Sequence, residues 1–416
     1  MSVPSVEGDS RAAIEYLSTP EAIRERCERI YSCALSGGLD HFTLHEERLE
    51  EVVELVAKVT LDDFPQLEIP YHSRWRHFDV GGIDRLAPLR ESLDATNTDE
   101  RARCEFDLVV TSVLLDAGAG PAWKYTEMST GLTLTRSEGL AVASLEIFRA
   151  GTFSSDADAP LRADAKTLRS VSPETLAAGL QAGQGNPLVG LEGRTSLLQA
   201  LGKVVAEKPH IFGAKTPRVG GLYDYIRPYA KEGYLSTRAI LSAILEGLGP
   251  IWPGRLTLDS TNLGDVGRHR AAGGSGASAG LVPFHKLSQW LAYSLFEPLE
   301  RAGITIVDSD ALTGLAEYRN GGLFVDTGVL IPKYSEVTQR AHRPDSEIVV
   351  EWRALTIALL DRLAERLRSR LSLDTESLPL AKVLEGGSWK TGRQLARERR
   401  ADGTPPIQIE SDGTFF

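Results

Sequence analysis

Leu281-Val-Pro-Phe-His-Lys-Leu-Ser-Gln-Trp-Leu-Ala-Tyr-Ser-Leu295 decides which fold we expect. The apolar residues of this stretch and its continuation recur with the 3.6-residue period of a helix that packs one face on a core. They are Phe284, Leu287, Leu291, Leu295 and Leu299. The other side carries a cation, an amide and two rings: Lys286, Gln289, Trp290 and Tyr293. Rings exclude water while polar tips orient a ligand, so this face is typical of a pocket wall. A helix buried on both sides, with Lys286 reaching the surface, is the alternative.

Helical periodicity continues through most of the chain. The clearest patterns cover residues 22–36, 49–59, 104–115, 138–149, 197–207, 237–246 and 346–369. Strand signals are few and short, at residues 304–307, 322–326 and 407–409. The sequence therefore predicts a mainly α protein with few short strands. We expect a flexible N-terminus over residues 1–16 and a single large helical catalytic domain over residues 17–416.

Composition excludes several classes of protein. The chain has 416 residues, of which 42% are hydrophobic and 25% charged, and its net charge of −11 argues against an extended nucleic-acid surface. Its three cysteines form no CxxC pair, which fits a reducing compartment. No apolar run reaches the roughly 20 residues needed to span a bilayer, and the N-terminus has no signal-peptide pattern. We expect a cytoplasmic protein that binds neither nucleic acid nor membrane.

The densest group of functional side chains lies in Tyr71-His-Ser-Arg-Trp-Arg-His-Phe-Asp79, which is predicted to be a loop or a short helix. Five of its residues are predicted to bind substrate: His72, Arg74, Trp75, Arg76 and His77. Arg74 and Arg76, with His72, are candidates for a phosphate, because a guanidinium fork matches phosphate oxygens. Structural ion pairs explain these arginines equally well. We expect no metal and no cofactor, since zinc spacings, a Walker loop and a Rossmann glycine fingerprint are missing.

A carboxylate stands in a second polar segment, Leu312-Thr-Gly-Leu-Ala-Glu-Tyr-Arg-Asn-Gly-Gly322. Beside an apolar pocket, Glu317 has the chemistry that cleavage of a glycosidic bond requires, and a nearby lysine would keep it ionised. The alternative is a surface pair between Glu317 and Arg319. Asp326 is the second candidate carboxylate. The predicted substrate-binding residues in these segments are His285, Gln289, Trp290, Tyr293, Tyr318 and Arg319. The ends of an upstream string, Asp116 and Trp123, are expected to form another wall of the pocket.

Four strings resemble a family of uracil-catabolism proteins found in fungi and bacteria, which carries a domain-of-unknown-function label. They are His72-Ser-Arg-Trp-Arg-His-Phe-Asp79, Pro283-Phe-His-Lys-Leu-Ser-Gln-Trp290, Leu315-Ala-Glu-Tyr-Arg-Asn-Gly-Gly-Leu-Phe-Val-Asp-Thr-Gly328 and Glu385-Gly-Gly-Ser-Trp-Lys390. The resemblance runs from about Leu17 to Phe416. It implies a role after ring opening in a non-reductive route that degrades uracil through a ribosyl-urea species. The expected partner is thus a small nucleotide-derived substrate.

A weaker resemblance suggests the reaction. Phe284-His-Lys-Leu-Ser-Gln289, Ala316-Glu-Tyr-Arg319 and Glu351-Trp-Arg-Ala354 are similar, in the same order, to three motifs of the queuosine-salvage nucleotide N-glycosylases. Those proteins are helical and similar in fold to DNA glycosylases. Their catalytic lysine and aspartate correspond to Lys286 and Glu317, so glutamate replaces aspartate here.

Three hypotheses remain open. The first is hydrolysis of the N-ribosidic bond of a ribosyl-urea, with or without phosphate, by Lys286 and Glu317. The second is an amidohydrolase that acts on an opened pyrimidine ring and needs a metal or an activated nucleophile. The third is a non-catalytic subunit that binds an intermediate. The glycine-rich stretch 271–280 is either a lid or an ordinary loop.

Overall fold

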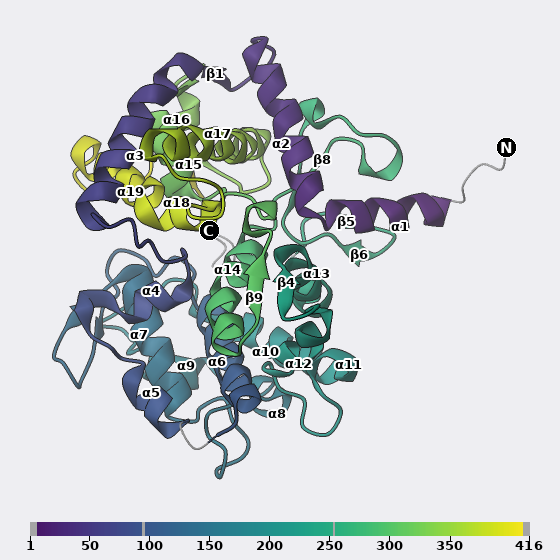
Figure 1. The fold of residues 1–416 in the computed structure, drawn as a ribbon, viewed down its shortest axis with the longest axis vertical. Coiled ribbons are helices and arrows are strands. Elements are labelled where there is room, and N and C mark those ends of the chain that lie inside the picture. The colour runs from purple at the N-terminus through teal and green to yellow at the C-terminus, as the bar shows by residue number, and fades with distance from the viewer. Residues whose placement is uncertain (1–5, 94–95, 253, 411–416) are drawn as a thin grey trace. The chain divides into compact units, whose positions relative to one another are not determined.

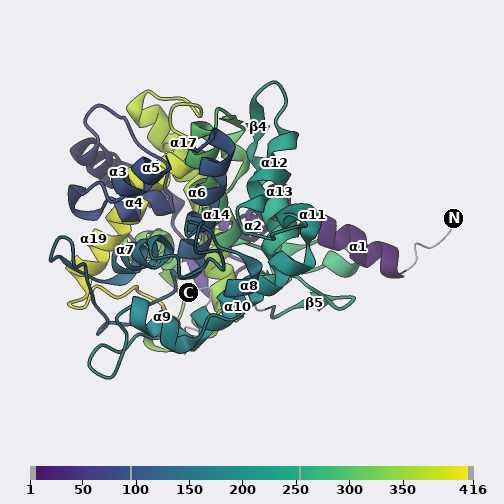
Figure 2. The same ribbon diagram turned by 90° about the horizontal axis from the view of Figure 1, so that it is seen from below.

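The structure, a computed structural model, describes residues 6–93, 96–252 and 254–410 (Figures 1 and 2). Within these ranges helices dominate, and every strand is two or three residues long, which confirms the predicted mainly α class. The contacts group the chain into two compact units where one domain was expected over residues 17–416. Unit 1 holds residues 6–72, 254–289 and 308–410, and unit 2 holds residues 73–252 and 290–307.

Unit 1 is built around one long helix, α17 (Glu347–Leu371), which contacts α2, α3 and α15 (Figure 1). Its other helices are α1 (Val6–Leu17), α2 (Pro20–Leu35), α3 (Leu49–Asp63), α15 (Tyr318–Asp326), α16 (Glu336–Gln339), α18 (Leu380–Val383) and α19 (Trp389–Arg399). Three short antiparallel pairs join β1 (Phe42–Leu44) to β10 (Leu330–Pro332), β5 (Thr257–Leu258) to β6 (Thr261–Asn262), and β7 (Val266–Arg268) to β8 (Leu281–Pro283). A parallel pair joins β11 (Ala341–His342) to β12 (Gln408–Ile409).

Unit 2 packs around α6 (Thr98–Leu114), whose residues 104–114 are all buried. Contacts with α6 come from α4 (Arg74–Phe78), α7 (Arg136–Arg149), α10 (Leu191–Glu207) and α12 (Gly221–Ile226). The remaining helices are α5 (Ala87–Ser92), α8 (Ala165–Leu168), α9 (Pro173–Gly179), α11 (Pro209–Phe212) and α13 (Thr237–Leu248). The strands are β2 (Tyr125–Thr126), antiparallel to β3 (Thr133–Leu134), and β4 (Tyr234–Ser236), parallel to β9 (Thr305–Val307). Helix α14 (Lys286–Arg301) gives residues 286–289 to unit 1 and residues 290–301 to unit 2.

One predicted strand is not present. Residues 322–326, predicted as a strand, lie inside helix α15, so that prediction is wrong. Position 321 requires glycine, because a Cβ there would lie 2.7 Å from the Trp352 indole. Helix α1 covers residues 6–16 of the N-terminus that we expected to be flexible and ends at Leu17, which joins an apolar cluster with Leu281. Residues 1–5 lie outside the described residues.

Stretch 271–280 is a loop with two short 3-10 turns that packs against the N-terminal helices of unit 1. Arg26 donates hydrogen bonds to the Ala272 carbonyl and the Ser278 hydroxyl, both at 3.1 Å. The Ala277 amide donates to Asp9 at 2.8 Å. These bonds hold both ends of the loop in this structure.

Three consecutive residues of α17 each hold a different segment of unit 1. Glu351 accepts hydrogen bonds from the His41 and Phe42 amides at 3.1 and 3.0 Å, at the start of β1. Trp352 donates its indole N–H to the Gly321 carbonyl at 3.0 Å. Arg353 makes a bidentate ion pair with Asp265, with both hydrogen bonds at 2.7 Å. All three side chains are buried, so the 351–353 string is a buried polar junction.

The Arg353–Asp265 pair predicts a large loss of stability on truncation. Burial raises the pKa of the Asp265 carboxyl, but the charge and hydrogen bonds of Arg353 outweigh burial and hold the pKa well below its usual range. Removing the arginine leaves a buried carboxylate without its partner. We expect Arg353→Met to lower the free energy of unfolding by about 3–5 kcal/mol, measured by guanidinium chloride denaturation.

The matched control is Arg343→Met. Arg343 pairs with Asp345 in the same bidentate way, at 3.0 and 2.9 Å, but its side chain is 71% exposed. Such a pair is worth less than about 1 kcal/mol. Equal losses for the two variants would contradict the structural role of the buried pair.

Candidate functional site

Lys286 is the first residue of α14, and two local features fix the start of the helix there. His285, just before it, has the left-handed backbone conformation, with a φ of 45°. The Lys286 amide donates to the Asp265 carboxylate at 2.9 Å, and the same carboxylate pairs with Arg353. The first turn of α14 is therefore anchored by the buried junction of α17, which places the lysine on a rigid support.

Glu317 is the N-cap of α15 and lies in the same unit as Lys286. Its two carboxylate oxygens accept hydrogen bonds from the Asn320 and Arg319 amides, at 2.5 and 2.7 Å. Burial raises the pKa of this carboxyl, whereas the two amides and the charges of Lys286 and His72 lower it, and burial outweighs the rest. The carboxylate is thus withdrawn from water, and Lys286 and His72 both act on it electrostatically.

His72 is buried and fixed by a carboxylate that was not among the predicted site residues. Its Nδ1 lies 2.8 Å from Oε2 of Glu385, and its ring centroid lies 6.3 Å from that of Trp389. Glu385 belongs to a π-helical turn, η8 (Leu384–Ser388), and such turns are frequent at functional sites. Gly387 permits the turn, because a Cβ there would lie 2.8 Å from the Val56 carbonyl oxygen of α3. The string Glu385-Gly-Gly-Ser-Trp-Lys390 was therefore a signal for a residue that supports His72.

Gln289 and His285 serve as internal connections in unit 1. Gln289 donates to the Thr313 hydroxyl at 2.7 Å and accepts from the Thr313 amide at 2.8 Å, which ties α14 to the segment leading to Glu317. The His285 Nε2 lies 2.9 Å from the Leu17 carbonyl oxygen, and burial lowers the pKa of this imidazole. Both groups hold the backbone around the Lys286 and Glu317 motifs.

The other predicted residues of unit 1 have partners away from Glu317. Asp326, at the end of α15, pairs with Arg400 through hydrogen bonds of 2.7 and 2.6 Å. Arg319 donates to the Gly403 carbonyl at 2.9 Å, and its guanidinium lies 4.9 Å from the ring centroid of the exposed Tyr318. The structure thus places the two candidate carboxylates at opposite ends of α15, and the charge of Lys286 acts on Glu317.

In unit 2, Arg74 forms the centre of a second group of predicted residues. Its Nε donates to Ser112 at 2.7 Å, and its Nη1 lies 3.1 Å from both His77 Nδ1 and Asp116 Oδ1. Its guanidinium carbon lies 5.8 Å from the Trp290 ring centroid. The ring of His77 lies 5.9 Å from that of Trp290. We call these four residues, Arg74, His77, Asp116 and Trp290, the Arg74 cluster.

The remaining predicted residues of unit 2 are bound in its interior or paired. Trp75 donates to the Ser294 carbonyl at 2.7 Å, and Trp123 donates to the Leu180 carbonyl at 2.9 Å. Tyr293 is fully buried against Phe296. Arg76 donates to Glu297 at 2.6 Å. Arg74 and Arg76 thus both contact carboxylates, as the ion-pair alternative predicted.

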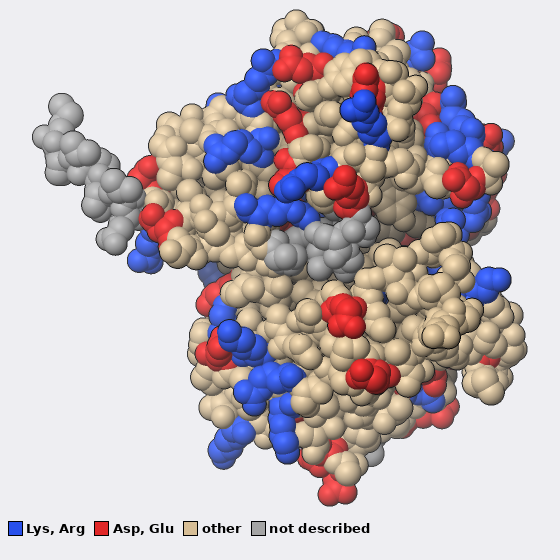
Figure 3. Space-filling view, turned by 180° about the vertical axis from the view of Figure 1, so that it is seen from behind, with Lys and Arg blue, Asp and Glu red and all other residues tan. Residues whose placement is uncertain are grey.

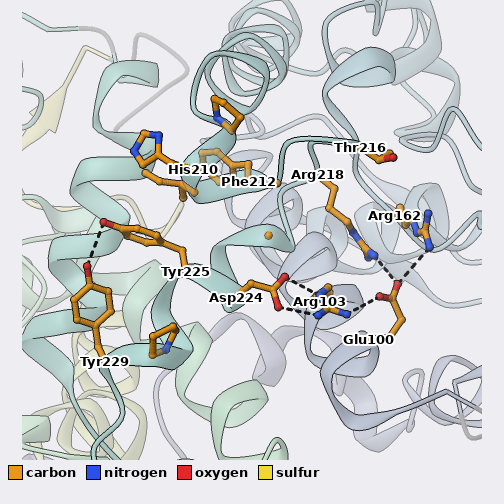
Figure 4. Close-up of a pocket in the computed structure, with 15 residues that line it drawn as sticks. Glu100, Arg103, Arg162, His210, Phe212, Thr216, Arg218, Asp224, Tyr225 and Tyr229 are labelled. Carbon is orange, nitrogen blue, oxygen red and sulfur yellow. Dashed lines mark hydrogen bonds and ion pairs between the residues drawn. The ribbon is translucent and has the colours of Figure 1, made fainter.

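A cavity of about 620 Å³ lies elsewhere in unit 2, and none of the predicted residues lines it (Figure 4). One side is aromatic, with His210, Tyr225 and Tyr229. On the other side Arg103 makes a bidentate pair with Asp224, at 2.7 and 2.8 Å, and also contacts Glu100. Its guanidinium groups are mostly occupied by carboxylates of the same unit, so the cavity is no obvious phosphate site.

The surface carries mixed charge. On the face shown in Figure 3, basic and acidic side chains are interspersed. Over residues 6–93, 96–252 and 254–410, no group of three or more His, Cys, Asp or Glu side chains is arranged to hold a metal ion. Within the same ranges, none of the helices combines the length and apolar character needed to cross a membrane.

Comparison with known proteins agrees with the motifs assembled above. Residues 16–416 match the family described as "Protein of unknown function (DUF1688)". The chain is 40% identical to "Protein urg3" of Schizosaccharomyces pombe, over 98% of this chain and 100% of that protein. It is 36% identical to "Uracil catabolism protein 4" of Lachancea kluyveri, over 97% of this chain and 99% of that protein. These matches cover both units and all four motif strings, so the chain belongs to the DUF1688 family.

Proposed function

We propose that this protein acts in uracil breakdown and hydrolyses the N-ribosidic bond of a ribosyl-urea, with or without a phosphate, to give urea and the ribose product. The pathway comes from the name of the Lachancea kluyveri relative. One observation supports the reaction: Glu317 is a desolvated carboxylate on which the charges of Lys286 and His72 act. Hydrolysis of a glycosidic bond uses such a carboxylate to activate water or to stabilise a cationic sugar.

The reaction requires one bond to break and one to form. The bond between the anomeric carbon and the urea nitrogen breaks, and a water oxygen bonds to that carbon. In this proposal Glu317 accepts the proton that the water loses. His72, oriented by Glu385, supplies the proton that the urea nitrogen gains. Lys286 favours the ionised form of Glu317 and opposes the effect of burial, since a nearby cation lowers the pKa of a carboxyl group.

The two candidate carboxylates allow a direct test. The purified protein is incubated with synthetic ribosyl-urea, with and without its phosphate, and urea is assayed. We expect Glu317→Gln to lower the rate of urea release by about 10²-fold or more, the usual contribution of a general base. Asp326→Asn should retain most of the rate, because that carboxylate pairs with Arg400.

Each other outcome of this assay rejects the proposal in a defined way. Normal activity in Glu317→Gln and loss in Asp326→Asn would transfer the role to Asp326. Binding without urea release would favour a subunit that only holds the intermediate. Activity on an opened pyrimidine ring that disappears on metal chelation would favour the amidohydrolase.

Glu317 also caps α15, and two substitutions separate this structural role from catalysis. Glutamine retains one acceptor oxygen for the helix amides, whereas alanine retains none. We expect Glu317→Ala to lose about 1 kcal/mol more stability than Glu317→Gln in denaturant unfolding. Both variants should be inactive. If activity follows stability across the two variants, Glu317 is a cap and nothing more.

The pH dependence of the rate tests the pairing of Lys286 with Glu317. The raised pKa of Glu317 means that the folded protein holds this proton more tightly than the unfolded chain does. Activity should therefore rise with pH through a pKa above the ordinary glutamate value, as the base ionises. Lys286→Met removes a charge that lowers this pKa, so the acidic limb should move to higher pH. An unshifted limb would show that the lysine acts otherwise.

A further inference from the structure

The Arg74 cluster contains three buried polar atoms without hydrogen-bond partners among the described residues. They are Nη2 of Arg74, Nε1 of Trp290 and Oδ1 of Asp116. Arg74 is completely buried, and the Trp290 residue and the Asp116 side chain are 7% and 8% exposed. Buried polar atoms are nearly always paired, so three in one place require an explanation.

The three atoms lie around one guanidinium group. Nη2 belongs to the group, Asp116 Oδ1 lies 3.1 Å from its Nη1, and the Trp290 ring centroid lies 5.8 Å from its central carbon. Asp116 Oδ1 forms an ion pair with Nη1, and a carboxylate oxygen has a further lone pair that can accept from a second donor. The cluster thus offers two donors and one acceptor in a small volume.

Surrounding residues hold this arrangement in place. Arg194 donates to the Leu115 and Ala117 carbonyls at 2.9 and 2.6 Å, which fixes the backbone on both sides of Asp116. The backbone of Arg74 is also held in place, because its amide donates to the Ser294 hydroxyl at 3.0 Å. Burial lowers the pKa of Arg194 to about 10 and also lowers that of Arg74, and Asp116 partly offsets both effects. The donors and the acceptor are therefore preorganised.

Charge decides which ligand fits. Arg74 and Arg194 contribute two positive charges, and Asp116 and Glu138, which both act on Arg74, contribute two negative charges. The dianion of a phosphate monoester would meet a buried carboxylate and would offer no donor to it. A neutral group with a carbonyl beside an N–H offers an acceptor to Arg74 and Trp290 and a donor to Asp116.

We infer that the Arg74 cluster is a binding site for a neutral planar ligand with an amide edge, a carbonyl oxygen next to an N–H. Urea, a ureido group and the ring of uracil all share this edge. The inference concerns unit 2 alone and does not depend on the hydrolysis proposed for Glu317. It replaces the expectation that Arg74 binds phosphate.

The indole N–H signals of the six tryptophans provide the readout. The protein is labelled with ¹⁵N at the tryptophan indoles, and urea, uracil and inorganic phosphate are titrated separately. We expect urea, uracil or both to shift the Trp290 signal, and the stronger of the two identifies the source of the edge. The signals of Trp75 and Trp123, whose N–H groups already donate to carbonyls, should stay in place.

Trp290→Phe and Trp75→Phe form a matched pair. Each removes one indole N–H, but only Trp75 loses a hydrogen bond inside the protein. We expect Trp290→Phe to weaken binding about tenfold and Trp75→Phe to leave binding unchanged. Both substitutions shrink a buried ring and should lower the melting temperature, and Trp75→Phe should lower it further because it also loses a hydrogen bond.

Two results would overturn the inference. A Trp290 shift with phosphate and with neither neutral probe would make the cluster an anion site. No shift with any probe would make it a structural core. Because no turnover is measured, either result leaves the proposed hydrolysis untouched.

Discussion

Unit 1 depends on the buried ion pair between Arg353 and Asp265. Two opposite charges taken out of water are stable only when their geometry and remaining hydrogen bonds are good. Here both conditions hold, since the pair is bidentate and Asp265 also accepts the Lys286 amide. The same carboxylate therefore neutralises the charge of Arg353 in α17 and accepts the first amide of α14. A protein that needed only a stable core could use apolar residues at these positions; an ion pair adds a defined direction to the first turn that carries the lysine.

The neighbours of Arg353 extend this logic. Trp352 holds the Gly321 carbonyl in α15, the helix that Glu317 caps. Gln289 of α14 holds Thr313, four residues before Glu317. Lys286 and Glu317 are thus each tied to α17 and are also tied to each other's segment. Catalytic groups need supports of this kind, because small displacements of a reacting group cost much of its effect.

Periodicity in the sequence was enough to predict the helices around α2, α3, α13, α14 and α17, since each has a long apolar stripe. It failed at residues 322–326, where a short apolar run has no period to distinguish a helix from a strand. The decision there comes from a glutamate cap and from an indole that requires a glycine, both contacts between distant parts of the chain. Glu385 was missed for a related reason: its role appears only when the π turn brings it to His72.

The sequence identifies which site residues could bind a ligand but not which of them are free to do so. Residue type shows that a side chain is able to bind a ligand, but only the fold shows whether its polar atoms are already occupied. The indole N–H groups of Trp75 and Trp123 donate to backbone carbonyls, whereas that of Trp290, an equally plausible aromatic in the sequence, has no partner. An indole N–H that is buried without a partner costs stability with no structural return. In the Arg74 cluster three such atoms occur together, and this grouping, rather than the arginine and tryptophan side chains as such, supports a binding role.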